Sequence, residues 1–168
     1  KNKFSNLRQE PSPSVLYVVG TPIGNLGDLS PRAKSLLSKI SIIACEDTRR
    51  TGKFLKIFGI QRPLLSFHQH NTKSRIPQLL QLLDNEESLA LISDAGLPGI
   101  SDPGEELVNA ARLNKYEVVC IPGPCAATTA LVISGFPSQR FCFEGFLPKK
   151  NNIRKKRLED ISQENRTT

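Results

Sequence analysis

The stretch "ISDAGLPGISDPGEELV" at residues 92–108 places three glycines, two prolines and two aspartates between two regular segments. The apolar run "SLALI" (88–92) before it is typical of a buried strand, and "PGEELVNAARLNK" (103–115) after it has the pattern of a helix that starts at a proline. Glycine permits left-handed turns and close backbone approaches, and proline fixes φ. Because open parallel sheets hold ligands in the loops after their strands, we expect a ligand-binding loop at residues 93–104.

The same order of strand and helix recurs along the chain. The expected strands are 14–19, 41–45, 63–67, 88–93, 116–121 and 140–146. The expected helices are 29–40, 47–59, 72–87, 103–115, 125–135 and 152–164. This alternation, with almost continuous apolar strands, predicts an α/β fold around a parallel sheet.

The domain organisation follows from a break in this pattern at "IPGPC" (121–125). We expect residues 14–122 to form an N-terminal α/β domain and residues 123–168 to begin a second α/β domain. Residues 1–13 are polar and predict a disordered leader. The chain contains no methionine, and it closes on "ENRTT" directly after an expected helix, so we expect a C-terminally truncated fragment of a longer protein.

Composition disfavours several classes of protein. No apolar run approaches the roughly 20 residues of a membrane helix, and the polar start does not resemble a secretory signal, so we expect no membrane association and a cytoplasmic location. The four cysteines, at positions 45, 120, 125 and 142, include no Cys-x-x-Cys pair and are expected to be buried free thiols. His68 and His70 lack an evident third ligand, so no metal site is expected.

Three loops that follow expected strands can converge on one cleft: "GTPIGNLGD" (20–28), "SDAGLPGISDPG" (93–104) and "PGPCAA" (122–127). The first loop lacks the G-x-G-x-x-G pattern of dinucleotide sites, and "TGKF" (51–54) lacks the Ser or Thr of a P-loop. These differences disfavour a nucleotide-dependent oxidoreductase and a P-loop enzyme.

The three loops contain no basic residue but do contain Asp28, Asp94 and Asp102. A mildly acidic lining suits a ligand with a ribose, an adenine edge and a positive centre, and S-adenosylmethionine is such a ligand. The alternative is that the glycines and prolines only shape turns while Asp94 and Asp102 cap helices.

Four motifs occur in order along the chain. They are "LYVVGTPIGNLGDLSPRA" (16–33), "ACEDTRRTGKFL" (44–55), "SDAGLPGISDPG" (93–104) and "PGPCAATTAL" (122–131) with "GFPSQRFCFEGFLP" (135–148). They resemble the successive motifs of the ribosomal RNA small-subunit methyltransferase I family, the RNA-modifying branch of the tetrapyrrole methylase superfamily. The resemblance implies S-adenosylmethionine-dependent 2′-O-methylation of a cytidine ribose in small-subunit (16S) ribosomal RNA. It also implies a homodimer of two-domain subunits with the cofactor between the domains.

By the same resemblance, the three loops supply the cofactor contacts. The residues expected to bind S-adenosylmethionine are Thr21, Pro22, Gly24, Ser93, Asp94, Ala95, Gly96, Pro98, Gly99, Ile100, Gly123, Ala126 and Ala127. The family's second domain continues beyond "ENRT" and adds further cofactor contacts.

The stretch "CEDTRR" (45–50) offers candidate catalytic groups at the end of the second expected strand. Methyl transfer to a ribose hydroxyl requires alignment of the 2′-oxygen and is helped by a base or a cation near the hydroxyl proton. We predict Glu46 and Arg49 in these roles. The alternative is that Asp47 caps the following helix while Glu46 and Arg49 form a structural pair.

The chain carries a net charge of +7, and residues 140–157 hold seven basic residues against one acid. The expected contacts to ribosomal RNA phosphates are Lys149, Lys150, Arg154, Lys155, Lys156 and Arg157, with Phe143 or Phe146 available to stack on a base. The alternative is an ordinary solvated face. Two further functions stay open: a tetrapyrrole or other small-molecule methyltransferase of the same fold, and an inactive RNA-binding fragment.

Overall fold

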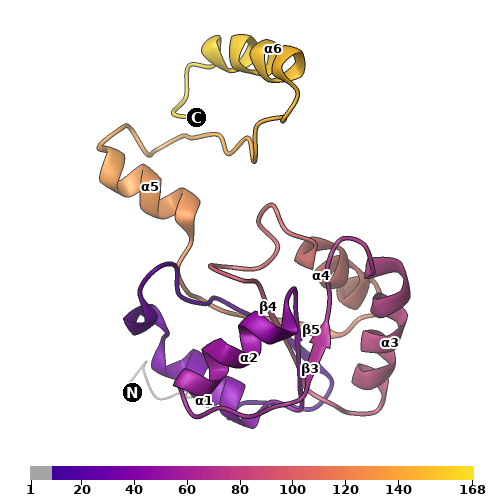
Figure 1. Ribbon diagram of the computed structural model, residues 1–168. Coiled ribbons are helices and arrows are strands. Elements are labelled where there is room, and N and C mark those ends of the chain that lie inside the picture. The colour runs from indigo at the N-terminus through magenta and orange to yellow at the C-terminus, as the bar shows by residue number, and fades with distance from the viewer. Residues whose placement is uncertain (1–8) are drawn as a thin grey trace, which may run out of the picture. The chain divides into compact units, whose positions relative to one another are not determined.

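The computed structural model describes residues 9–168 (Figure 1). The chain divides into two compact units, Lys1–Pro124 and Cys125–Thr168. The first unit contains β1 (Val15–Val19), η1 (Leu26–Asp28), α1 (Pro31–Lys39), β2 (Ile42–Cys45), α2 (Thr48–Ile57), β3 (Leu64–Ser66), α3 (Thr72–Asp84), β4 (Leu89–Ile92), α4 (Gly104–Leu113) and β5 (Glu117–Ile121). The second unit contains α5 (Ala126–Ser134) and α6 (Asn151–Ser162).

The five strands of the first unit form one parallel sheet in the order β3-β2-β4-β1-β5. In the middle of the sheet, Leu16 of β1 lies beside Leu89 of β4 and Val118 of β5. The parallel α/β prediction is therefore confirmed. Since all five strands run the same way, the loops that follow them leave from one edge of the sheet.

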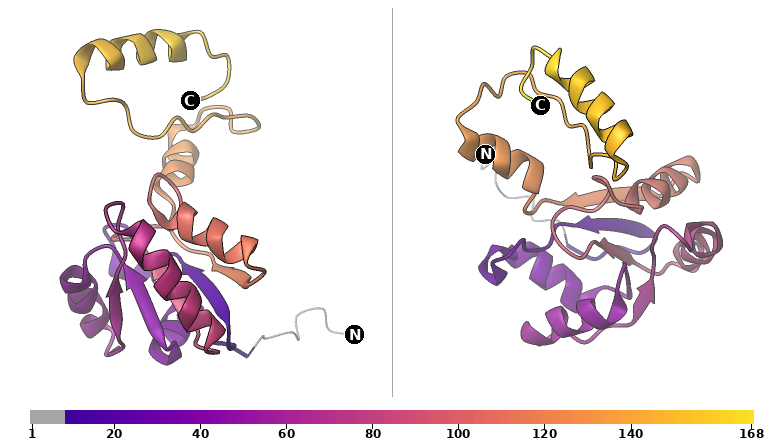
Figure 2. Two further views of the ribbon diagram at one scale, coloured as in Figure 1. Left: turned by 90° about the vertical axis from the view of Figure 1, so that its right-hand side faces the viewer. Right: turned by 45° about the horizontal axis from the view of Figure 1, so that its top comes forward.

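Helices cover both faces of this sheet and form two separate apolar cores. On β1, Tyr17 packs in the core that includes side chains from α1 and α2, whereas its neighbour Leu16 packs in the core that includes side chains from α3 and α4. This alternation is what a pleated strand imposes. The left view of Figure 2 shows α3 and α4 together in front of the strands.

The helix starts follow the predicted capping chemistry. Ser30 is the N-cap of α1, its hydroxyl accepts a hydrogen bond from the Ala33 N–H at 3.1 Å, and Pro31 occupies the first helical position. The helices α3 and α4 end three and two residues before their predicted ends. Glu86 and Lys115 adopt left-handed φ values of 62° and 63°, which terminate α3 and α4.

Two glycines set the spacing at the carboxyl edge of the sheet. The Gly20 N–H donates to the Ile121 carbonyl at 3.1 Å, which carries the pairing of β1 and β5 one residue beyond the strands. A Cβ added to Gly20 would lie 2.6 Å from the Gly123 Cα, and the reverse substitution would place it 2.7 Å from the Gly20 Cα. The loops after β1 and β5 therefore meet backbone to backbone.

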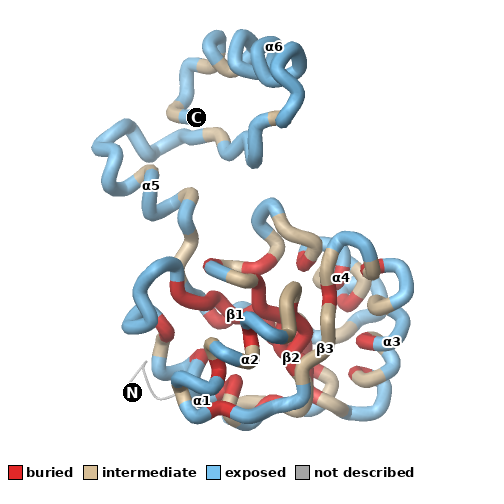
Figure 3. Tube along the Cα trace, in the orientation of Figure 1, coloured by how far each residue is buried: buried red, intermediate tan, exposed pale blue. Residues whose placement is uncertain are grey.

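The second unit has no buried residue, as the pale tube in Figure 3 shows. The strand predicted at 140–146 is wrong, because this segment makes only an isolated bridge between Phe141 and Thr167. A strand requires a neighbouring strand to pair with, and within residues 125–168 no such strand is present. Gly145, at φ 70°, also turns the backbone out of the extended region.

Three further expectations concern single features. All four cysteines are free, but only Cys45 is buried, and Cys120 is exposed. Within residues 9–168, no helix is long and apolar enough to cross a membrane. Residues 1–8 of the predicted leader lie outside the described residues, and Glu10 accepts hydrogen bonds from the Arg32 guanidinium at 2.5 and 2.9 Å.

Gly20→Ala is expected to lower the free energy of unfolding by about 1–3 kcal/mol, because the methyl group would meet backbone that cannot move aside. Urea denaturation followed by circular dichroism measures this. Gly52→Ala is the matched control, because its methyl group would meet only Leu64 Cδ1 at 3.8 Å within a helix. It should stabilise the protein by about 0.5–1 kcal/mol, and equal effects of the two substitutions would contradict the close backbone contact.

Candidate cofactor site

The loops after β1 and β4 are joined by main-chain hydrogen bonds. The Thr21 N–H donates to the Gly96 carbonyl at 2.9 Å, and the Gly96 N–H donates back to the Thr21 carbonyl at 3.1 Å. The Thr21 hydroxyl, which is buried, lies within hydrogen-bonding distance of the carbonyls of Ser93 and Gly96. Two of the three predicted cofactor loops are therefore fixed to each other.

The third loop reaches the same place. Gly96 has a φ of +84°, and a Cβ on it would lie 3.1 Å from Ile23 Cδ1 and 3.4 Å from the Pro124 carbonyl oxygen. Only glycine adopts this conformation without strain. Its lack of a side chain also leaves room for Ile23 and the Pro124 carbonyl to lie close to it. The loops after β1, β4 and β5 thus converge at one edge of the sheet.

A cavity of about 220 Å³ opens at this edge. Its lining consists of Thr21, Pro22, Gly24, Asn25, Leu26, Arg50, Thr51, Phe54, Ile92, Ser93 and Asp94. Five of the predicted cofactor residues belong to this lining, namely Thr21, Pro22, Gly24, Ser93 and Asp94. The remaining residues of the β4 loop, Ala95, Gly96, Pro98, Gly99 and Ile100, lie outside it, and Gly123 packs against Gly20.

Ala126 and Ala127 belong to the second unit, where they form the first turn of α5. Ala127 lines a separate apolar groove of that unit, together with Leu131, Phe141 and Phe143. The role of these two alanines toward the cofactor stays a prediction.

Arg50 is a lining residue that the sequence interpretation passed over. Its Nη1 donates to Asp94 Oδ2 at 2.9 Å, so an ion pair connects the first turn of α2 with the loop after β4. Arg49, which was preferred on sequence grounds, has a side chain that is 90% exposed and lies 3.6 Å from Asp47. Because β2 and β4 are neighbours in the sheet, Arg50 and not Arg49 reaches Asp94. The sequence alone does not reveal that these strands are neighbours.

Neither aspartate of the β4 loop is the N-cap of a helix, because Pro103 is the N-cap of α4. Asp102 Oδ1 accepts hydrogen bonds from the N–H groups of Gly99 and Gly104, at 2.8 and 2.7 Å, and so fixes the turn that leads into α4. Asp94 caps no helix. Its Oδ1 is buried and has no hydrogen-bond partner among the described residues.

Comparison with known proteins identifies the family to which the chain belongs. The sequence pattern of the tetrapyrrole (corrin/porphyrin) methylases matches residues 15–168. The chain is 52% identical, over 93% of its length, to "Ribosomal RNA small subunit methyltransferase I" of Xylella fastidiosa (strain Temecula1) and 48% identical, over 90%, to the protein of that name from Thermotoga maritima. The chain belongs to the ribosomal RNA small subunit methyltransferase I family. The resemblance drawn from the motifs is thereby confirmed.

The match covers different shares of the relatives. The chain spans 57% of the Xylella protein, 55% of the Synechocystis protein of the same name and 68% of the Thermotoga protein. A crystal structure of uroporphyrin-III-C-methyltransferase from Thermus thermophilus superposes with a TM-score of 0.56 at 20% identity, over 76% of this chain and 54% of that one. This structural likeness confirms the tetrapyrrole-methylase-like fold.

In this member of the methyltransferase I family, Glu46 lies between β2 and α2 and is half-buried. Burial raises the pKa of its carboxyl, and the charges of Asp94 and Asp102 raise the pKa further, while the Asp94 N–H and His68 oppose them. The neighbouring Asp47 caps α2 by accepting from the N–H groups of Arg49 and Arg50, and these bonds lower the pKa of Asp47. The alternative interpretation of this stretch is therefore correct in that Asp47 caps the helix. It is wrong about the structural pair, because Arg49 pairs with Asp47 and not with Glu46.

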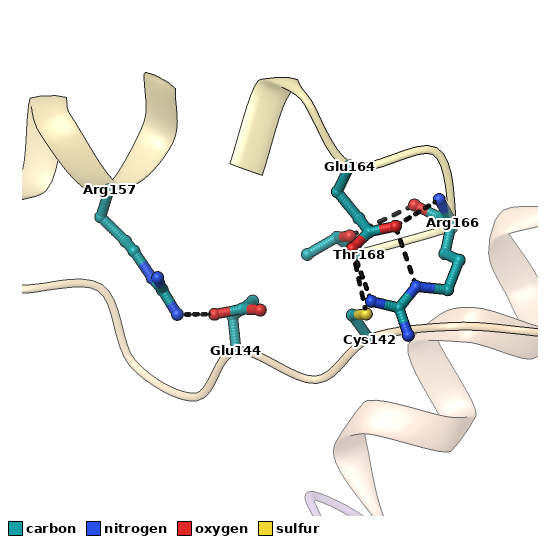
Figure 4. Close-up of polar contacts among 6 residues, drawn as sticks. All are labelled: Cys142, Glu144, Arg157, Glu164, Arg166 and Thr168. Carbon is teal, nitrogen blue, oxygen red and sulfur yellow. Dashed lines mark hydrogen bonds and ion pairs between the residues drawn. The ribbon is translucent and has the colours of Figure 1, made fainter. Parts of the chain in front are cut away.

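The predicted RNA-binding cations lie on and just before α6 in the second unit, and all six are exposed. Figure 4 shows that Arg157 donates to Glu144, a contact that ties α6 to the segment before it. In the same unit, the Arg166 guanidinium donates hydrogen bonds to both carboxylate oxygens of Glu164. These bonds lower the pKa of the Glu164 carboxyl to about 2. The four lysines make no ion pair within residues 9–168, so their charges face solvent.

The histidine pair follows β3 at the same edge of the sheet. The rings of His68 and His70 lie 5.9 Å apart, centroid to centroid, and the Asn71 side chain contacts His68 at 3.4 Å. Across residues 9–168, the structure brings together no group of three or more His, Cys, Asp or Glu side chains that could hold a metal ion.

Glu46→Gln is expected to stabilise the protein at neutral pH. A carboxyl whose pKa is raised by folding binds its proton more tightly in the folded state, so folding stability falls as the pH rises from the ordinary carboxyl pKa to the raised one. Glutamine removes this cost. Melting temperatures of both proteins from about pH 4 to about pH 8 measure the difference, which should vanish at the acid end.

Asp28→Asn is the control for this measurement, because Asp28 is an exposed acid of the first loop. Asp28→Asn should leave the change in melting temperature between acid and neutral pH as it is in the unsubstituted protein. If Glu46→Gln also left that change unaltered, the buried carboxyl would not have the raised pKa assigned to it.

Proposed function

We propose that this protein uses S-adenosylmethionine to methylate the 2′-oxygen of a cytidine ribose in small-subunit (16S) ribosomal RNA. The proposal is supported by relatives about half identical in sequence that are named ribosomal RNA small subunit methyltransferase I. It is also supported by a cavity that two of the predicted cofactor loops line, those after β1 and β4. The small-molecule alternative has less support, because the uroporphyrin-III enzyme is similar in fold alone.

The cavity has features that suit S-adenosylmethionine. Asp94 Oδ1 is a buried acceptor without a donor, and the cofactor carries hydroxyl and ammonium donors. Gly24 and Pro22 contribute small uncharged groups to the lining, which leave room for an uncharged part of the ligand. At about 220 Å³ the space is smaller than the roughly 300 Å³ at which ligand pockets begin, so these residues would hold part of the molecule.

When bound, the cofactor supplies a methyl group on a positively charged sulfur. The chain must then orient the ribose, exclude water and accept the proton of the 2′-hydroxyl. Glu46 is our candidate for the proton acceptor, because its raised pKa makes it a stronger base than an ordinary carboxylate. Arg49, exposed beside it on the first turn of α2, is our candidate for the cation that orients the RNA backbone.

The exposed cations Lys149, Lys150, Arg154, Lys155, Lys156 and Arg157 are proposed to contact RNA phosphates. We further propose that the partner is the small ribosomal subunit, that the enzyme acts in the cytoplasm, and that it works as a homodimer without a metal. These proposals extend the family membership and the charge of residues 140–157.

Expression in a bacterium that lacks its own family member tests the reaction. We expect small-subunit ribosomal RNA to gain one 2′-O-methylated cytidine, detected as an alkali-resistant linkage, and Asp94→Ala to abolish it. Because the chain spans about half of the Xylella relative, a second version continues it past Thr168 with that relative's residues. Methylation on a base, or none from the extended version while the Xylella protein restores it, would overturn the proposal.

Replacing Lys155 and Lys156 by glutamine is expected to weaken binding to small-subunit ribosomal RNA. Each phosphate contact releases counterions, so loss of two contacts should reduce the slope of log affinity against log salt by about 1.5. Filter binding over a salt series measures the slope. Lys39→Gln with Lys53→Gln removes the same charge from the first unit, and an equal change there would contradict a specific role for α6.

A further inference from the structure

The cavity holds one pair of opposite charges. Of the eleven residues that line it, Arg50 and Asp94 are the two that are charged. Their side chains are 67% and 28% exposed, so Asp94 lies deeper and Arg50 nearer the opening. A ligand that enters this cavity therefore meets a cation and an anion that are 2.9 Å apart.

Each member of this pair has hydrogen-bonding capacity to spare. Asp94 uses Oδ2 for the ion pair and leaves Oδ1 buried without a donor. Arg50 donates through one Nη to Asp94, and a guanidinium has five N–H donors. The other polar side chains of the lining contact protein groups. The Thr21 and Ser93 hydroxyls lie near backbone carbonyls, Asn25 Oδ1 accepts from the Gly27 N–H, and the Thr51 side chain interacts with the Cys45 thiol.

The backbone fixes where the two charges stand. Asp47 accepts from the Arg50 N–H and so sets the first turn of α2. Asp94 follows β4, which pairs directly with β2, the strand that leads into α2. A pair held in this way is organised before a ligand arrives, which reduces the ordering cost of binding.

We propose that Arg50 and Asp94 together form the subsite that binds the α-amino-carboxylate end of the methyl donor. The ammonium group donates to Asp94 Oδ1, and the carboxylate accepts from the free edge of the Arg50 guanidinium, a geometry that arginine favours. The inference rests on the proposed function, because that function names the cofactor. A sulfonium centre would not satisfy Asp94 Oδ1, because it has no N–H or O–H to donate.

Two ligands that share an adenosine separate this subsite from the rest of the site. S-adenosylhomocysteine carries the amino-acid end, and 5′-methylthioadenosine lacks it. We expect Arg50→Gln and Asp94→Asn each to weaken S-adenosylhomocysteine binding by about 10- to 100-fold, the usual effect of losing a hydrogen bond to a charged group. Affinity for 5′-methylthioadenosine should change by less than about twofold, because the proposed subsite binds only the amino-acid end. Isothermal titration calorimetry measures both affinities, on the 168-residue chain and on the version extended past Thr168.

Lys53→Gln is the matched control, because it removes a positive charge from an exposed position of α2 outside the cavity lining. It should leave both affinities unchanged, and thermal melts establish that each variant is folded. Equal losses for Arg50→Gln and Lys53→Gln would show an effect of net charge and overturn the inference.

Three other outcomes would also overturn it. Equal weakening of 5′-methylthioadenosine binding would assign Asp94 to the ribose, and unchanged affinity for both ligands would remove the pair from the site. Binding of neither ligand by the unsubstituted version extended past Thr168 would remove the cofactor from this cavity. None of these measurements involves RNA. Failure of the subsite is therefore separate from failure of ribose methylation, which the rRNA analysis reports.

Discussion

Parallel pairing between β2 and β4 is the constraint on which the candidate site depends. These strands are separated by two helices and a third strand in sequence, yet they lie side by side in the sheet. Their pairing brings the start of α2 against the loop after β4, which allows Arg50 to reach Asp94 and places the charges of Asp94 and Asp102 near Glu46. Both the ion pair and the altered acidity of Glu46 thus follow from strand order.

Much of the first unit could be predicted from local chemistry. Ser30 followed by Pro31 marks a helix start without any knowledge of the fold, and Asp47 caps α2 in the same way. Apolar runs of four or five residues between turn signals mark buried strands, since a strand covered on both faces has no polar side. The glycine and proline content of the β4 loop likewise indicated a shaped loop at the end of a strand.

What sequence reasoning missed depends on contacts between distant segments. Arg49 and Arg50 are adjacent and identical in type, and only the neighbour of β2 distinguishes them. The segment 140–146 is rich in phenylalanine, as strands often are, but a strand forms only where another strand supplies its hydrogen bonds. Glu86 and Lys115 end their helices in a conformation that these residue types seldom adopt, so no local signal marks those ends.

The contact between Gly20 and Gly123 has a consequence for how the site changes during evolution. Where two loops touch through main chain alone, the surface they form consists of peptide groups, which every amino acid carries. Substitutions elsewhere in these loops can alter side chains while this surface keeps its shape. Side chains are therefore restricted at these two positions, while the other positions of the two loops can change without moving the loops apart.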